Sequence, residues 1–279
     1  MKGYKKITLA LAAVAALVAC GAKKQSDKQQ DVSGSPKYLV LYYSQTGTTK
    51  AVAEELQKML GTDIDSIMPE EPYAGSYDQT IERGRQEREN GVTPALVPLK
   101  VNPDDYDVIF LGYPVWFGTY ALPVAGLLKE YDFAGKKVVP FCTFGSGGLE
   151  SSAEDLKKAL PKAEIAEGYG VRTARMAAVP KELNRFLVEN SYLEGELEAL
   201  PDYSEQQPVT DEDKAVFDAA CGGYRFPLGT PLTVGKRGTA DGTDYLYTVK
   251  NADNEGIATI YVTVGKEADA KPEFTRIVR

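Results

Sequence analysis

Residues 38–50 of the chain read Tyr-Leu-Val-Leu-Tyr-Tyr-Ser-Gln-Thr-Gly-Thr-Thr-Lys. The first six residues form a continuous apolar run, which is typical of a strand buried on both faces of a sheet. From Gly47 onward the apolar residues recur at helical spacing, with Val52 and Leu56 on one face. A buried strand that passes directly into a helix predicts a parallel sheet covered by helices on both sides.

The same alternation of strand and helix continues as far as residue 189. Further strand-like runs lie at residues 63–67, 107–113, 137–142 and 163–166, and helix-like runs at residues 76–90, 121–131, 151–160 and 180–189. Five strands that alternate with helices predict a doubly wound α/β domain with a five-stranded parallel sheet. Ligands of such sheets bind beyond the carboxyl ends of the strands, where the strand order reverses.

The pattern changes after residue 190. Residues 191–208 form an acidic connection, and residues 209–279 predict a small α+β domain of unknown role. One helix is expected at residues 211–220, and strand-like runs follow at residues 224–234, 245–249, 258–264 and 274–278. The run at residues 258–264 alternates apolar and polar side chains, which predicts an antiparallel sheet with one face in water.

The first 20 residues have the features of a lipoprotein signal peptide. Three lysines lie within residues 1–6, and an apolar run at residues 7–18 is too short to span a bilayer comfortably. The run ends in Leu-Val-Ala-Cys-Gly at residues 17–21, which resembles the bacterial lipobox. Cys20 is therefore the expected site of acylation, and its acyl chains would anchor the protein to a membrane.

Residues 21–36 are polar and predict a flexible tether between the anchor and the first domain. Gly21 follows the cysteine where Asp would favour the inner membrane, so we expect a lipid-anchored protein of the bacterial cell envelope, on the outer membrane rather than the inner one. The alternative is an ordinary signal peptide in which Cys20 occurs by chance.

The composition argues against several classes of function. The net charge is -8, whereas proteins that track phosphate backbones are usually basic, so we expect no nucleic-acid partner. The chain contains no His, which excludes a Ser-His-Asp triad and argues against a zinc site. Cys142 and Cys221 either pair as a disulfide in an oxidising compartment or remain two separate buried thiols.

Three loops follow the first, third and fourth predicted strands. The first loop, residues 44–50, places hydroxyl side chains and a glycine at a helix start, where unpaired N–H groups attract an anion such as a phosphate. The second loop, residues 112–119, holds the only Trp of the chain, and a flat ligand would give that ring a packing surface. The third loop, residues 143–148, has three glycines, which let backbone N–H groups face a ligand.

Each loop taken alone also has a plain structural interpretation. The first is compatible with a simple capped helix, the second with a loop folded onto its own core, and the third with a flexible turn. Their combination at one edge of a sheet resembles the flavodoxin family, in particular the branch with a Gly-Tyr-Pro-x-Trp-[Trp/Phe]-Gly loop and a Phe-Cys-Thr-x-Gly-Ser-Gly segment. The resemblance covers roughly residues 37–190 and implies strand order 2-1-3-4-5 with FMN as the cofactor.

The resemblance also implies which residues hold the cofactor. It assigns the FMN phosphate to Ser44, Gln45, Thr46, Gly47, Thr48 and Thr49. It assigns the isoalloxazine and ribityl contacts to Pro114, Val115, Trp116, Phe117, Gly118, Thr143, Phe144, Gly145 and Gly147. Phe144 stands where relatives often carry His, so a stacking contact is expected there in place of a polar one. We expect no catalytic side chain and no metal.

The implied function is redox chemistry carried by FMN, either in an electron carrier or in a small flavin or quinone reductase. The net negative charge favours docking to a basic redox partner protein. A reductase that uses NAD(P)H would need basic residues for its phosphate-rich donor, whereas a quinone or flavin-type substrate would not. The alternative is a non-catalytic surface lipoprotein that uses the fold as a binding module.

Overall fold

The computed structural model describes residues 35–224, 226–252 and 256–279. The expected signal peptide, Cys20 and nearly all of the expected tether therefore lie outside the described residues. In the part of the chain that is described, no helix is both long enough and apolar enough to cross a lipid bilayer.

The sheet of the first half has the strand order β2-β1-β3-β5, and β6 and β7 both pair with β5. Its parallel strands are β1 (Tyr38–Tyr42), β2 (Asp63–Ser66), β3 (Val108–Trp116), β5 (Lys137–Phe144), β6 (Glu164–Ile165) and β7 (Tyr169–Arg172). This confirms the predicted order 2-1-3-4-5. The fifth strand is divided, and a Cβ added to Gly168, between its two parts, would lie 2.6 Å from the carbonyl oxygen of Pro140.

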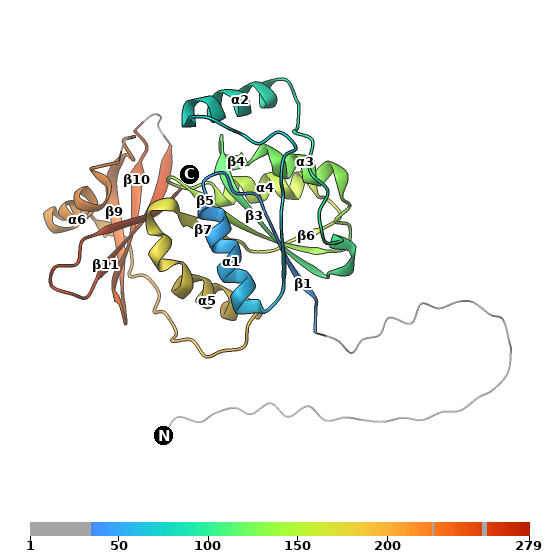
Figure 1. Ribbon diagram of the computed structural model, residues 1–279. Helices are drawn as coiled ribbons and strands as arrows, with labels where there is room; N and C mark the ends of the chain where they lie inside the picture. The colour runs from blue at the N-terminus through green and yellow to red at the C-terminus, as the bar shows by residue number, and fades with distance from the viewer. Residues whose placement is uncertain (1–34, 225, 253–255) are drawn as a thin grey trace, which may run out of the picture. The chain divides into compact units, whose positions relative to one another are not determined.

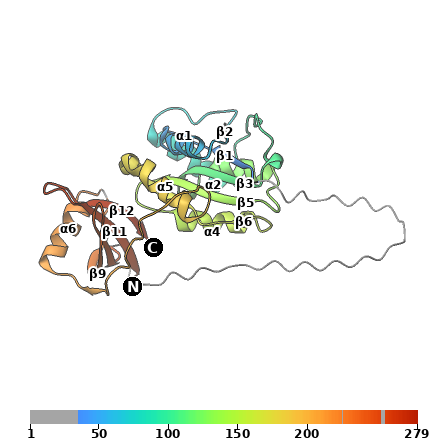
Figure 2. The ribbon, with the colours of Figure 1, turned by 90° about the horizontal axis from the view of Figure 1, so that it is seen from below.

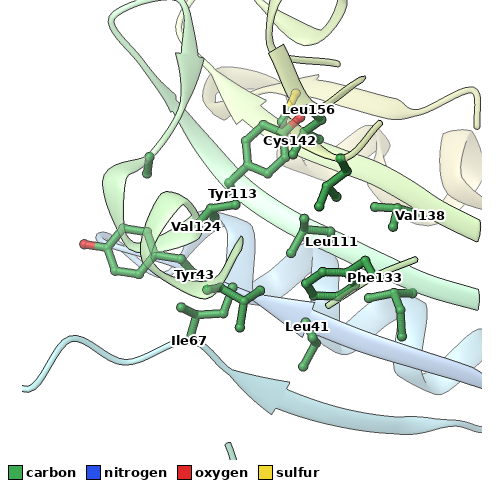
Figure 3. Packing of buried hydrophobic residues seen from close by; sticks show 14 of the residues in the cluster. Leu41, Tyr43, Ile67, Leu111, Tyr113, Val124, Phe133, Val138, Cys142 and Leu156 are labelled. Carbon is green, nitrogen blue, oxygen red and sulfur yellow. The ribbon is translucent and has the colours of Figure 1, made fainter. Parts of the chain in front are cut away.

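Helices cover both faces of this sheet (Figure 1). One face packs against α1 (Thr48–Leu60) and α5 (Val179–Glu189), and the other packs against α3 (Leu122–Glu130) and α4 (Leu149–Ala159). Successive residues of β1 point to opposite faces. Val40 belongs to the apolar cluster under α1 and α5, and Leu39 and Leu41 belong to a second cluster under α3 and α4. Figure 3 shows this second cluster, in which Leu111 and Phe133 lie near Leu41. Burial on both faces explains why the strand is apolar at every position.

The predicted helix at residues 76–90 is confirmed as α2 (Tyr77–Glu89). It begins with a capping box: the Ser76 side chain accepts from the Gln79 N–H, and the Gln79 side chain accepts from the Ser76 N–H. The helix is largely exposed, as its run of charged residues indicates. A short 3-10 turn, η1 (Pro103–Asp105), leads into β3.

The second half is an antiparallel sheet with the strand order β12-β11-β10-β9-β8, and Figure 2 shows it with its helix α6. Its elements are β8 (Gln207–Pro208), α6 (Asp211–Cys221), β9 (Thr230–Thr239), β10 (Gly242–Lys250), β11 (Ile257–Gly265) and β12 (Glu273–Val278). The predicted helix at residues 211–220 is confirmed. The strand predicted at residues 224–234 begins only at Thr230, because Gly229 has a φ of 114° and turns the backbone there.

The two faces of this second sheet differ. Phe217 of α6 packs with Tyr247 and Ile260 in an apolar core. Tyr261 and Thr263 point the other way, as their alternation predicts. They do not simply face bulk water, however, because they line a pocket of about 770 Å³ together with η2 (Thr173–Ala178) and α5.

Both cysteines within the described residues are free and buried. Cys142 belongs to a core cluster of the first half and Cys221 to the core of the second. Burial raises the pKa of the Cys142 thiol, and it raises the pKa of Cys221 to about 12. The two therefore remain separate thiols, one of the two arrangements left open by the sequence.

Candidate functional site

The first loop forms an open cradle of backbone N–H groups. Gly47 has a φ of 91° and precedes the 13-residue helix α1. Its own N–H donates to Ser44 Oγ at 3.1 Å. Among the described residues, the N–H groups of Gln45, Thr46 and residues 48–50 have no protein partner. Such a group of unpaired donors at a helix start is suited to an anion.

The threonines of the first loop divide into two kinds. Thr46 Oγ1 lies 3.3 Å from Thr48 Oγ1 near the surface, where both hydroxyls can reach a ligand. Thr49 is fully buried, and its Oγ1 lies 2.8 Å from Thr143 Oγ1, which is buried as well. The assignment of Thr49 and Thr143 to the cofactor therefore stays a prediction, which these two buried side chains do not support. They join the first loop to the third instead.

Gln45 is held by two aromatic neighbours that the sequence did not single out. The Tyr43 hydroxyl donates to Gln45 Oε1 at 2.5 Å, and Gln45 Nε2 donates to the Tyr73 carbonyl oxygen at 2.7 Å. Burial raises the pKa of both tyrosines, and a hydrogen bond to Glu87 raises that of Tyr73 further. Both phenols therefore stay protonated at neutral pH and act as fixed donors.

The second loop, predicted at residues 112–119, is a β-hairpin. Strand β3 continues to Trp116 and pairs with β4 (Thr119–Tyr120). The two turn residues, Phe117 and Gly118, have φ values of 52° and 80°. Positive φ at both positions is the type I′ geometry that matches strand twist. Pro114 and the neighbouring aromatic residues conceal this strand extension in the sequence.

The aromatic side chains of the hairpin have different surroundings. The Trp116 ring packs edge-on against Tyr43 at 5.7 Å and Tyr73 at 5.1 Å between centroids. Phe117 is 38% exposed, and the Arg88 guanidinium lies 5.7 Å from its ring centre while donating to its carbonyl oxygen. Trp116 thus has protein packing partners already, and Phe117 is the more accessible ring.

In the third loop, the side chain of Phe144 is not available to a ligand. Its side chain is 3% exposed and packs in the core against Gly170, where an added Cβ would lie 2.7 Å from the ring. The expectation that this ring stacks on the cofactor is therefore not supported. By contrast, the N–H groups of Gly145, Ser146 and Gly147 have no partner among the described residues.

The three loops lie at the same sheet edge and touch in pairs. Thr49 and Thr143 join the first to the third, and the Tyr43 and Trp116 rings join the segment before the first loop to the second. Ser151 Oγ, in the first turn of α4, donates to the Gly118 carbonyl oxygen at 2.6 Å. Val115 lies so close to Gly148 that an added Cβ would approach it to 2.7 Å.

Two pockets adjoin these loops and have no lining residue in common. One of about 310 Å³ lies at the first loop, lined by Ser44, Gln45 and Gly47 together with Tyr73. The other, of about 400 Å³, lies at the hairpin, and its lining residues include Trp116, Phe117, Arg88, Asp155 and Lys158. The structure thus brings the three predicted loops together, but the two pockets beside them remain separate.

Residues 37–185 match the sequence model of a family described as flavodoxin. The chain belongs to the flavodoxin family. The antiparallel sheet lies beyond the matched residues. None of the curated proteins compared with the chain matches it.

Several solved structures are similar to the first half of this flavodoxin-family chain. A candidate flavoprotein from Bacteroides eggerthii is 32% identical, with 54% of this chain and 98% of the other covered and a TM-score of 0.48. One from Bacteroides uniformis is 26% identical, with 54% and 99% covered and a TM-score of 0.49. A flavoprotein from Lactobacillus acidophilus, solved in complex with FMN, is 21% identical, with 53% and 98% covered and a TM-score of 0.45.

Proposed function

We propose that this protein binds FMN at the edge formed by its first, second and third loops and acts as an envelope redox protein. The observation that carries the proposal is a pair of groups of open N–H donors, one at residues 45, 46 and 48–50 and one at residues 145–147, on loops joined by the Thr49–Thr143 contact. FMN is the cofactor of the flavodoxin family, and its phosphate and polar ring edge need two such sets of donors.

The residues present fit a phosphorylated flavin. The phosphate would lie at the N-terminus of α1, held by backbone N–H groups and by the Thr46 and Thr48 hydroxyls. Lys50 is not needed for this, because its Nζ lies 3.6 Å from Glu54 on the exposed helix face. The third loop would donate to the ring edge or the ribityl chain, and Phe117 offers an aromatic face nearby.

The chemistry would be that of the cofactor. Bound FMN supplies one- or two-electron transfer. The protein contributes binding, orientation and shielding: the Thr49–Thr143 bond fixes the spacing of two loops, and Gln45 is fixed by Tyr43 and Tyr73. The partner would be a redox protein or a small quinone or flavin-type substrate.

Uptake of FMN by the purified chain tests this function. We expect a yellow preparation, and we expect apoprotein to quench the fluorescence of added FMN. Riboflavin should bind at least about tenfold more weakly, because it lacks the phosphate and loses about 1.4 kcal/mol or more of binding free energy. A colourless protein that takes up no FMN would contradict the proposal and favour the non-catalytic binding module.

Addition of NADH or NADPH to the FMN-loaded protein then separates the two redox roles. Turnover with a quinone or free flavin acceptor identifies a reductase. Reduction only through a partner protein identifies a carrier.

We also propose that the protein is lipid-anchored through Cys20, most favourably on the outer membrane. Support comes from the lipobox-like sequence at residues 17–21. Cys20→Ser should move the protein from the membrane fraction to the soluble fraction, with FMN uptake unchanged. If the substituted protein stays membrane-bound, the anchor is not this cysteine.

A further inference from the structure

The antiparallel sheet is attached to the third loop through its edge strand. The Ile277 N–H of β12 donates to the Ser146 carbonyl oxygen at 3.0 Å. A Cβ added to Gly147 would lie 2.3 Å from the Ile277 carbonyl oxygen. Only a glycine allows the two backbones to approach this closely. In Figure 1 the C-terminus accordingly lies close to the end of β5.

Arg172 makes the second connection. This last residue of β7 donates from Nε to the Gly145 carbonyl oxygen at 2.8 Å and from Nη1 to the Phe274 carbonyl oxygen at 2.6 Å. Its guanidinium lies 4.2 Å from the ring centre of Phe274 and 5.6 Å from that of Tyr224. The Arg172 side chain, from the first half, thus contacts the second half and the third loop at the same time.

These contacts fix the direction of two peptide units. The carbonyl oxygen and the N–H of a trans peptide unit point in opposite directions. Because the Gly145 carbonyl is bound by Arg172, the Ser146 N–H points away from that guanidinium. Because the Ser146 carbonyl is bound by Ile277, the Gly147 N–H points away from β12. Neither N–H has a partner among the described residues.

We propose that Arg172 and strand β12 are positioning elements of the FMN site, through which the antiparallel sheet presets the third loop to donate hydrogen bonds to the flavin. This inference rests on the proposed function. It gives the second half of the chain a role in the redox site, since the ring of a flavin gains negative charge on reduction and fixed N–H donors favour that charge.

The test uses the full chain with three single substitutions. Arg172→Gln removes the bridging charge, and Tyr224→Leu removes one ring beside the guanidinium while leaving Arg172 in place. Lys181→Gln is the matched control, because Lys181 pairs with Asp241 between the same two halves without contacting the third loop. Each variant is measured for its FMN dissociation constant, for the midpoint potential of the bound flavin and for far-UV circular dichroism.

We expect Arg172→Gln to raise the FMN dissociation constant about tenfold, as a lost charge-assisted hydrogen bond of roughly 1.4 kcal/mol would do, and to make the midpoint potential more negative. Tyr224→Leu should shift both in the same direction by less, and Lys181→Gln should shift neither. Unchanged affinity and potential in a folded Arg172→Gln protein would overturn the inference. A wild-type chain that takes up no FMN would instead overturn the proposed function itself, and the inference with it.

Discussion

The first and third loops are built alike and covered differently. Each follows a buried parallel strand and ends at a glycine of positive φ before a helix, Gly47 before α1 and Gly148 before α4. A Cβ added to Gly47 would meet nothing within 4 Å, whereas one added to Gly147 would strike the backbone of Ile277. The same connection can therefore be an open anion cradle or, when a second sheet packs on it, a fixed set of donors.

The largest effect is expected where the covered loop is most crowded. Gly147→Ala should lower the free energy of unfolding by about 3 kcal/mol, the upper range for overpacking, because the Ile277 backbone cannot yield as a flexible side chain does. Urea denaturation measures this. Gly238→Ala in β9 is the control, since its added Cβ meets nothing within 4 Å. Equal losses for both would show that β12 is not seated on the loop.

The next effect concerns the bond between the two loops. Thr49→Val should cost about 2 kcal/mol, because it leaves the buried Thr143 hydroxyl without its partner. Thr143→Val should behave in the same way, and the double variant should cost less than the sum. Additive losses in this double-mutant cycle would mean that the two hydroxyls are not coupled.

A smaller effect is expected at the open loop. Gly47→Ala should cost about 1 kcal/mol through backbone strain alone, because a φ of 91° disfavours any side chain while the space around it is free. Gly47→Asn should recover part of this loss, since Asn tolerates the left-handed region better. Thermal unfolding of both variants measures the difference. A loss as large as that of Gly147→Ala would contradict the contrast between the loops.

The smallest effect lies within the second half, away from both loops. Burial alone would raise the pKa of Asp213, but hydrogen bonds from Lys236 and Thr210 outweigh burial and hold the pKa below its ordinary value. A lowered folded-state pKa stabilises the protein above the ordinary Asp pKa and loses that effect as the pH falls through the lowered value. Asp213→Asn should therefore cost up to about 1 kcal/mol at pH 7.

The pH dependence of this loss is the check. At pH 3 the difference in unfolding free energy between wild type and Asp213→Asn should shrink, and FMN affinity at pH 7 should be unchanged. A difference that grows toward acid pH would contradict the direction of the pKa shift.

The local sequence pattern was sufficient to predict the parallel sheet and the loops at its open edge. The apolar run at residues 38–43 and the glycine and hydroxyl residues after it predicted a buried strand, its helix and the loop between them. The helix at residues 76–90 was equally evident from its charged run. These features depend on residues that are neighbours in sequence, which is why they could be predicted.

Contacts between segments that are distant in sequence could not be predicted in the same way. Thr49 reads as a surface hydroxyl until Thr143, 94 residues later, is placed against it. Phe144 reads as a ring for stacking until Gly170 provides its pocket in the core. Tyr43 could have been predicted as a site residue from the sequence, since it directly precedes the first loop. The sequence pattern near Gly147 does not predict its contact with Ile277.

Amide hydrogen exchange of the full chain, with and without FMN, tests the central claim most directly, because it reports on the backbone N–H groups themselves. We predict that FMN slows exchange at residues 45–50 and 145–147 together, while the amides of α6 exchange at unchanged rates. FMN binding that leaves either of these two loops unprotected would contradict the account.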